Sequence, residues 1–494
     1  MSENKNHSAQ RMNIEAAKRI VGTVRTTLGP MGMDKMMVDG GGNVIVTNDG
    51  ATILRELDSA HPAAKMIVEV SKMQEANCHD GTTSSVVLAG QLLANAEGLF
   101  DKGLHPNVIN KGYIHAMNES RAFLDSFSAP LNKESLADIA RTAITGKSLE
   151  ASEEQVAQLC VDTINAVGDV GKVRMLAAPG GSLSDSYLFN GVVVNKDLLG
   201  QDSIPGEVGP RILLLNCGLE EEQQKANMQV QVDATSYSSV KNADREHLLD
   251  AAKKVVAAKP KVVFVRDGVH DTVVSYLRKA GIAVCRRLPE STMKRLSSEL
   301  GAEIYHSPED DMVCQLGGIE RREYNDVAYL FVNGIMKEQG GEATLVLFGA
   351  TQSTLDEVQR GFDDALGVVS LVANGDTTVY GGGVAYLMTA MHLRENASTI
   401  GGRAQMAIES FADALESIPG TIAENAGHDA LDTILAMRHA GGTMGPDVEN
   451  GGIACMKELG VREPKSLVRS AITSATEVAT AILRIDDVIG RRGE

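Results

Sequence analysis

The sequence contains no tryptophan, and aromatic residues make up only 4% of its 494 positions. Its interior must therefore be packed mainly by aliphatic side chains and by the 20 methionines, within a hydrophobic fraction of 43%. The six cysteines are scattered and form no Cys-x-x-Cys pair. This usage is typical of a reducing compartment, and it argues against a disulfide framework and against a zinc site.

Positive charge is also scarce, because 65 acidic residues outweigh 47 lysines and arginines and give a net charge of −18. Such a chain is repelled by nucleic acid and by anionic membranes, so we expect neither as a main partner. No apolar run is long enough to span a bilayer, and residues 1–7 lack the apolar core of a signal peptide. We therefore expect a soluble, cytoplasmic protein.

The two ends of the chain have a helical pattern. Apolar residues recur at helical spacing from Ile14 to Leu28, in the stretches 63–76 and 83–98, and again from Pro464 to Ile482. Two short runs, 36–38 and 44–46, are separated by glycines and predict a β-hairpin.

The middle of the chain has a different pattern. Short apolar runs at 211–215, 262–265 and 282–284 predict buried strands, and they alternate with helical stretches at 269–279 and 291–300. A chain of this length should form two to four domains. We predict a helical domain built from both chain ends, with an α/β domain inserted between them through segments 132–198 and 348–380.

Two aspartate turns are the strongest local signals for chemistry. Thr47–Thr52 and His79–Ser84 each place one carboxylate beside backbone N–H groups and hydroxyls that can open a helix. A helix N-terminus favours phosphate, and a carboxylate beside bound phosphate favours Mg²⁺. The two turns together predict a nucleotide site, although Asp-Gly sequences are also common in ordinary turns.

Other candidates are weaker when each is taken alone. Thr27–Pro30 and Gly381–Gly383 are glycine turns that could approach a ligand, or could simply end and begin helices. Thr145–Ser148 has the Gly-Lys-Ser ending of a P-loop, but Arg141 stands where that motif requires glycine, so a P-loop ATPase is not expected. Lys147 could still reach a phosphate, or could be a surface lysine.

Two acidic features remain to be assigned. Asp363 and Asp364 lie on a helical pattern, where one could serve as a general base and the other as a solvated charge. His79-Asp80 and His428-Asp429 resemble the pairs of metal-dependent HD phosphohydrolases, but the 11 histidines show no helical metal spacing.

Taken in order, these motifs resemble the chaperonin family, and more closely its group II branch of thermosomes and eukaryotic cytosolic chaperonins. The resemblance runs nearly end to end. The motifs that carry it are Thr27–Lys35, Thr47–Leu54, His61–Lys65, Asp80–Thr83, Thr145–Lys147, Asp363–Leu366, Gly381–Gly383, Ala423–Gly427 and Leu483–Ile489.

The resemblance implies a multidomain α and α/β fold. Its parts would be a helical equatorial domain, a small α+β intermediate domain, and an α/β apical domain with a helical lid protrusion at about 233–256. The boundaries would be 1–131 and 381–494 for the equatorial domain, 132–198 and 348–380 for the intermediate domain, and 199–347 for the apical domain.

The resemblance also implies a site for ATP and Mg²⁺, with K⁺ as a further candidate ion. Asp80 would hold the metal, Asp364 would activate the attacking water, Asp49 would help to orient it, and Lys147 would lie near the γ-phosphate. The remaining nucleotide contacts would be Leu28, Gly29, Pro30, Gly81, Thr82, Thr83, Ser84, Gly382 and Glu463.

The function that the resemblance implies is ATP-driven folding of unfolded polypeptide. This would take place inside two stacked rings with eight subunits in each ring, which the built-in lid closes without a separate co-chaperonin. Among the departures from the family pattern, His79 stands where glycine is usual, Gly420 replaces a common arginine, and Thr235–Ser239 make the lid segment polar. These departures leave open a ring that acts chiefly as a scaffold or holdase with weak ATPase activity. A small-molecule phosphohydrolase is the third hypothesis.

Overall fold

The computed structural model describes residues 8–38, 41–42, 44–57, 61–130, 136–147, 152–199, 209–220, 234–335 and 341–487. Contacts divide the chain into two compact units, one of residues 1–164 and 356–494 and the other of residues 165–355. The chain passes from one unit to the other within two helices, α7 (Glu153–Val167) and α11 (Gln352–Ala373). The five-segment domain division expected from the sequence stays a prediction.

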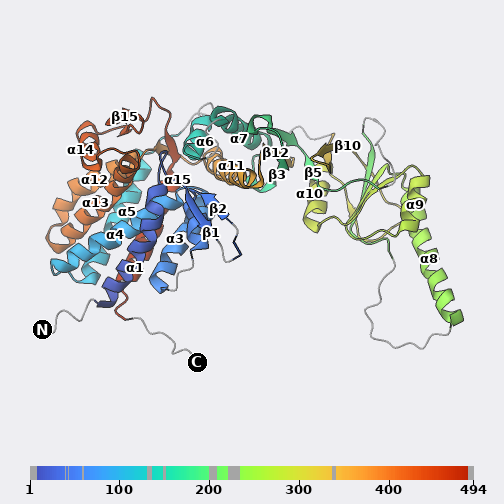
Figure 1. The fold of residues 1–494 in the computed structure, drawn as a ribbon, viewed down its shortest axis with the longest axis horizontal. Helices are drawn as coiled ribbons and strands as arrows, with labels where there is room; N and C mark the ends of the chain where they lie inside the picture. Colours follow the sequence, from blue (N-terminus) through green and yellow to red (C-terminus); the bar gives the residue numbers. More distant parts are fainter. Residues whose placement is uncertain are drawn as a thin grey trace. The chain divides into compact units, whose positions relative to one another are not determined.

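The first unit is a helical bundle made from both chain ends. In Figure 1 the blue N-terminal helices interleave with the orange and red C-terminal helices. The helices predicted at residues 14–28, 63–76, 83–98 and 464–482 are all present. The bundle and its smaller helices comprise α1 (Ser8–Val24), the 3₁₀ turn η2 (Arg25–Thr27), α2 (Gly50–Glu56), α3 (Pro62–Cys78), α4 (Thr82–Asp101), α5 (Pro106–Phe127), α6 (Leu136–Ile144), α12 (Val384–Ile400), α13 (Gly402–Asn425), α14 (Ala430–Ala440) and α15 (Lys465–Leu483).

Two helices of the bundle begin with the same device. Pro62 and Pro106 occupy the first turns of α3 and α5, where the missing N–H costs nothing. The preceding residues, His61 and His105, each accept a hydrogen bond through Nδ1 from a backbone N–H of that turn, at 3.2 and 3.1 Å. These His-Pro pairs fix where the helices begin.

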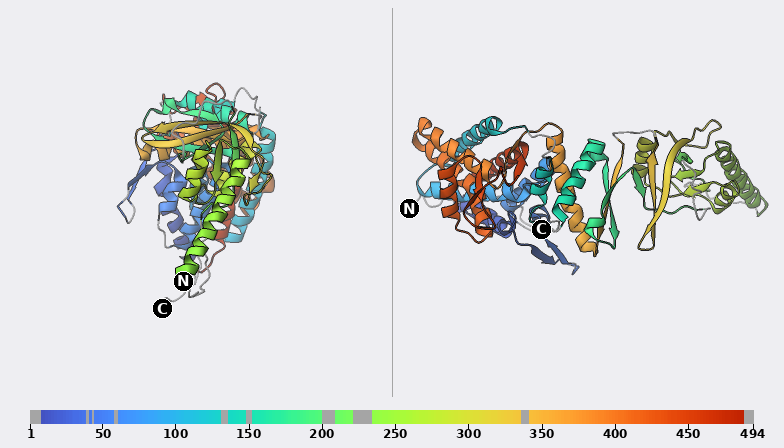
Figure 2. Two further views of the ribbon diagram at one scale, coloured as in Figure 1. Left: turned by 90° about the vertical axis from the view of Figure 1, so that its right-hand side faces the viewer. Right: turned by 90° about the horizontal axis from the view of Figure 1, so that it is seen from above.

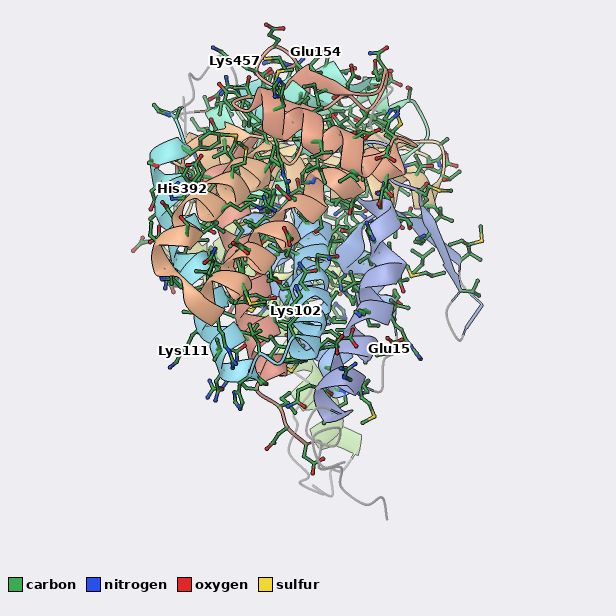
Figure 3. All side chains as sticks on the ribbon, turned by 90° about the vertical axis from the view of Figure 1, so that its left-hand side faces the viewer. Glu15, Lys102, Lys111, Glu154, His392 and Lys457 are labelled. Carbon is green, nitrogen blue, oxygen red and sulfur yellow. The ribbon has the colours of Figure 1, made fainter. Side chains whose placement is uncertain are left out.

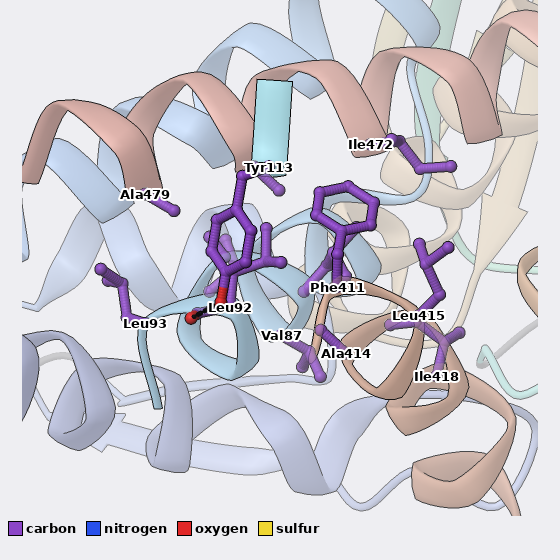
Figure 4. Packing of buried hydrophobic residues seen from close by; sticks show 14 of the residues in the cluster. Val87, Leu92, Leu93, Tyr113, Phe411, Ala414, Leu415, Ile418, Ile472 and Ala479 are labelled. Carbon is purple, nitrogen blue, oxygen red and sulfur yellow. Dashed lines mark hydrogen bonds between the residues drawn. The ribbon is translucent and has the colours of Figure 1, made fainter. Parts of the chain in front are cut away.

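The core of the bundle joins helices that are far apart in the chain. Tyr113 of α5 and Phe411 of α13 meet edge to face with ring centroids 5.6 Å apart, and both are completely buried. The Tyr113 hydroxyl donates to the carbonyl of Leu92 in α4 at 2.9 Å. Aliphatic residues of α4, α13 and α15, such as Leu415 and Ile472, fill the space around the rings (Figure 4). Charged side chains such as Lys102 and Lys111 lie on the outside of this unit (Figure 3).

Short strand pairs complete the first unit. The predicted hairpin is present as β1 (Lys35–Val38) and β2 (Val44–Thr47) and projects from the helices (Figures 1 and 2). Two further antiparallel pairs join distant or local segments. They are β13 (Thr378–Tyr380) with β16 (Arg462–Pro464), and β14 (Met444–Pro446) with β15 (Ile453–Cys455).

The second unit is an α/β structure with two sheets. The larger sheet has the order β5-β11-β10-β6-β7-β8, with β9 also paired to β6. Its strands are β5 (Val192–Val194), β6 (Arg211–Leu215), β7 (Val262–Val265), β8 (Ala283–Cys285), β9 (Ile304–Tyr305), β10 (Gln315–Tyr324) and β11 (Val327–Gly334). The smaller sheet places β12 (Ala343–Gly349) between β3 (Val173–Pro179) and β4 (Tyr187–Asn190).

Helices accompany the parallel strands of the larger sheet, as the sequence predicts. They are α8 (Ala234–Ala257), α9 (Asp271–Lys279) and α10 (Glu290–Leu300), and the short helices η5 (Val170–Lys172) and η6 (Leu183–Asp185) precede them. The segment expected to form a lid, about 233–256, is helical from Ala234, and Asp233 lies outside the described residues. The side chains of 234–245 also lie outside them, so the polar lid tip stays a prediction. Within the described ranges, no helix is long and apolar enough to cross a membrane.

Candidate functional site

A cavity of about 540 Å³ lies within the first unit, a volume in the usual range for small-molecule sites. It is lined by residues from both ends of the chain and from α6 and α11. Every site residue predicted from the sequence lines it: Leu28, Gly29, Pro30, Asp49, Asp80, Gly81, Thr82, Thr83, Ser84, Lys147, Asp364, Gly382 and Glu463.

The Asp80 turn is fixed by its neighbours. Helix α3 is followed by its C-cap His79, which has a left-handed backbone (φ +62°), and Gly81 is the N-cap of α4 with φ +76°. The side-chain amide of Gln74 donates to the Asp80 carbonyl at 3.0 Å. A Cβ on Gly81 would lie 2.8 Å from Leu467 Cδ2 of α15, so a larger residue would displace that side chain and would also be strained at this positive φ. Asp80 is thereby held at the cavity wall.

The first turn of α4 is suited to bind an anion. Its N-cap is Gly81, which has no side chain to accept from the first N–H groups. Thr82, Thr83 and Ser84 of this turn all line the cavity. An uncapped helix N-terminus with hydroxyls beside it is a ready phosphate site.

The Asp49 turn packs directly against the Asp80 turn. A Cβ on Gly50 would lie 2.4 Å from Thr83 Oγ1, so this glycine permits the close approach. The Asp49 carboxylate accepts from the backbone N–H groups of Ala51 (3.2 Å) and Thr52 (2.8 Å), which makes it the N-cap of α2. A role in orienting water stays a prediction for Asp49, in addition to this capping role.

An ion pair joins the base candidate to the lysine. The ammonium of Lys147 lies 2.6 Å from Asp364 Oδ2 and 3.9 Å from Asp80 Oδ1. The side chains of Lys147 and Asp364 are 18% and 24% exposed. Asn48 holds the lysine loop in place, because its amide donates to the carbonyl of Gly146 at 2.6 Å. Lys147 is therefore a cavity residue rather than the surface lysine that the sequence left open.

Burial and neighbouring charges in the cavity shift the pKa values of several side chains. Burial raises the pKa of Asp364 to about 7, and the charge of Asp80 adds to this, while Lys147 opposes it. Burial would lower the pKa of Lys147, but Asp364 and Asp80 raise it above its usual value, so this group stays protonated. Burial also raises the pKa of Glu463 to about 8, assisted by the charge of Asp80. Perturbed groups gathered in one cleft are typical of a functional site.

Two further walls of the cavity are built from backbone. Asn425 donates to the carbonyls of Arg25 (3.1 Å) and Leu28 (2.8 Å), which fixes the turn that continues into Gly29 (φ +86°). On another wall, β13 pairs with β16 and brings Glu463 opposite Val379, just before the glycine turn 381–383. A Cβ on Gly381 would lie 2.9 Å from a Glu463 oxygen, so the glycine turn and this carboxyl group pack together.

Arg360 and Tyr386 are among the cavity residues that sequence reasoning missed. Arg360 lies four residues before Asp364 on α11, and this helical spacing could have indicated that the two share a face. Tyr386 lies in the first turn of α12, and its hydroxyl is buried without a hydrogen-bond partner in the described chain. The apolar flanks of Tyr386 gave no sign in the sequence that its ring would line a site.

The acidic groups do not form a metal cluster. Among the described residues, no three His, Cys, Asp or Glu side chains are arranged to hold a metal ion. The geometry therefore gives no support to an HD-type phosphohydrolase, which needs such a cluster. Mg²⁺ fits the cavity better, because it commonly binds through one or two carboxylates together with substrate phosphates. Asp80, beside the uncapped start of α4, is placed for that role.

Comparison with known proteins agrees with this geometry. Residues 20–492 match the model of the TCP-1/cpn60 chaperonin family. The chain is 39% identical to the "Thermosome subunit alpha" of Archaeoglobus fulgidus over 98% of its own length and 92% of the relative. It is 40% identical to the "Thermosome subunit" of Methanopyrus kandleri over 98% and 92%, and 40% identical to that of Pyrococcus abyssi over 97% and 91%. The chain belongs to the TCP-1/cpn60 chaperonin family.

Proposed function

We propose that this chain is an ATP-hydrolysing subunit of a protein-folding chaperonin of the thermosome type. The observation that carries the proposal is the convergence of Asp80, Lys147 and Asp364 at the uncapped N-terminus of α4 in one cavity. The family membership and the thermosome relatives support it independently.

Each group has a distinct task in this proposal. Asp80 would hold Mg²⁺, which supplies charge neutralisation at the phosphates when it is bound. The first turn of α4 binds the phosphates through its N–H groups and hydroxyls. Asp364, with a pKa of about 7, is close to the optimum for a general base at neutral pH. Lys147 provides positive charge and orients Asp364.

The proposal extends to the assembly. Unfolded polypeptide is the proposed client, and two rings of eight subunits are the proposed assembly, closed by the helical segment around 233–256 and without a separate lid protein. We also propose three domains for each subunit: an equatorial domain (1–131, 381–494), an intermediate domain (132–198, 348–380) and an apical domain (199–347). ATP, Mg²⁺ and K⁺ are the proposed ligands. Because Asp364 lies on α11, whose chain continues into the second unit, a shift of α11 would couple hydrolysis to domain motion.

Two substitutions separate binding from chemistry. Asp80→Ala should weaken Mg·ATP binding, whereas Asp364→Ala should spare binding and abolish turnover. Asp356→Ala is the matched control, because this exposed carboxylate on the same helix does not line the cavity. Binding is measured by calorimetry and turnover by phosphate release.

Three outcomes would count against the proposal. Wild-type turnover no faster than that of Asp364→Ala would leave only the scaffold or holdase role. Equal binding and equally poor turnover in the Asp80 and Asp364 variants would contradict their separate tasks. Electron micrographs that show monomers instead of double rings would contradict the assembly.

A further inference from the structure

A contact between His79 and Gly367 joins the Asp80 turn to the helix that carries Asp364. His79 directly precedes Asp80 in the chain, and Gly367 lies three residues after Asp364 on α11. Residues three apart share a helix face. The contact therefore links the segment with the proposed metal ligand to the segment with the proposed base.

The fit between the two residues is tight. A Cβ on Gly367 would lie 2.1 Å from Cγ of His79 and 2.4 Å from its Cβ and Cδ2, so the imidazole sits in the space that a side chain would fill. Because Cβ and Cγ are the nearest atoms, rotation of the ring could not relieve a clash. Only movement of the turn or of α11 would do so.

Both residues are locally unfavourable where they stand. His79 is the one non-glycine residue with positive φ in the described part of the first unit, and L-residues pay a steric cost in that region. Gly367 lies within a 22-residue helix, where glycine is worse than alanine. Two unfavourable choices that meet at one contact beside a functional site suggest that the contact itself has a use.

We propose that His79 is a positioning residue whose ring, seated against Gly367, sets the distance of α11 from the Asp80 turn and so holds Asp364 at its working position. The inference rests on the proposed ATPase function. It adds to that function the residue pair that keeps the proposed base, Asp364, at a fixed distance from the proposed metal ligand, Asp80. The proposed phosphate-binding turn of α4 has other contacts that hold it, because Gln74 donates to the Asp80 carbonyl and Leu467 packs against Gly81.

The test is a double-mutant cycle on steady-state ATPase. Gly367→Ala should lower kcat by about tenfold or more, since displacements near 1 Å have such effects on catalytic geometry, while KM for ATP stays within about twofold. His79→Gly leaves a void and should lower kcat by about three- to tenfold. The double variant His79→Gly/Gly367→Ala should recover most of the activity that Gly367→Ala loses, because the clash is gone.

A matched control separates this contact from glycine replacement in general. Gly98 also lies within a helix, α4, and a Cβ there would meet nothing within 4 Å. Gly98→Ala should leave kcat unchanged and should not lower the melting temperature. If Gly367→Ala does not fold, the test is made with His79→Gly, for which we expect a lower kcat and an unchanged KM for ATP.

Unchanged kcat in His79→Gly would overturn the proposal, as would equal kcat in Gly367→Ala and the double variant. If either result is obtained while the wild type hydrolyses ATP, only the positioning role of His79 is overturned, and the proposed function stands. A wild type without ATP hydrolysis would overturn the proposed function, and this inference with it.

Discussion

Removal of the Lys147 charge should raise the pKa of Asp364 and so shift the pH dependence of ATP hydrolysis. The ammonium lies 2.6 Å from the carboxylate and is the main influence that lowers its pKa against burial. A hydrogen bond between charged groups contributes about 1.5–3 kcal/mol. Since one pKa unit corresponds to 1.36 kcal/mol, Lys147→Met should raise the pKa of Asp364 from about 7 by about 1–2 units.

The assay is the pH profile of kcat/KM, which reports the titration of the free enzyme. Because the base must be deprotonated, activity should fall as pH decreases through about 7 in the wild type and through about 8–9 in Lys147→Met. Lys147→Arg keeps the charge and should lower the rate without moving this limb. An acid limb of Lys147→Met within about 0.3 units of the wild-type limb would refute the assignment of Asp364 as the titrating base.

Two further substitutions test neighbouring groups. Asp49→Asn should preserve the melting temperature, because asparagine caps helices as well as aspartate does. The same substitution should lower kcat, because the charge proposed to orient water is lost. An unchanged kcat would show that Asp49 acts only as a helix cap. The folded state raises the pKa of Glu463 from 4.5 to about 8, so it holds a proton that the unfolded chain releases. The stabilisation from this proton is complete below about pH 4.5 and is lost as pH rises through 8. The melting temperature of Glu463→Gln relative to the wild type should therefore rise between pH 5.5 and 8.5, whereas a constant difference would contradict the shift.

Local structure was well predicted where the signal is local. The predicted helices, the β1–β2 hairpin and the strands of the parallel sheet all depend on apolar periodicity or on glycine and proline, and each is present. The antiparallel pair β10–β11 was missed, although its two-residue turn, Asn325-Asp326, has positive φ at both positions and uses residue types that favour it. The passage between units within α7 and α11 left no mark in composition, because both helices continue unbroken through it.

The site was predictable in its parts but not in its interactions. The sequence patterns around Asp49 and Asp80 indicate a site directly. The family resemblance assigned roles in that site to Asp364 and Lys147. The ion pair between those two joins residues 217 positions apart, and no local pattern encodes it. The contact of His79 with Gly367 is of the same kind, since it depends on the packing of α11 against a turn that is distant in the chain.

The charge balance of the cavity is a physical reason to expect a metal ion with the proposed nucleotide. The three arginines that line the cavity each form an ion pair with a neighbouring carboxylate: Arg55 with Glu75, Arg141 with Asp138 and Arg360 with Glu357. Lys147, the lysine that lines the cavity, is engaged by Asp364. A bare polyphosphate would thus meet aspartates without matching positive charge, and the N–H groups at the start of α4 supply only a partial charge. A divalent cation held by Asp80 would offset this repulsion, and it would also weaken the attraction of Lys147 to Asp80. The same cation would then lower the pKa of Asp364 and favour the ionised base only when substrate is bound.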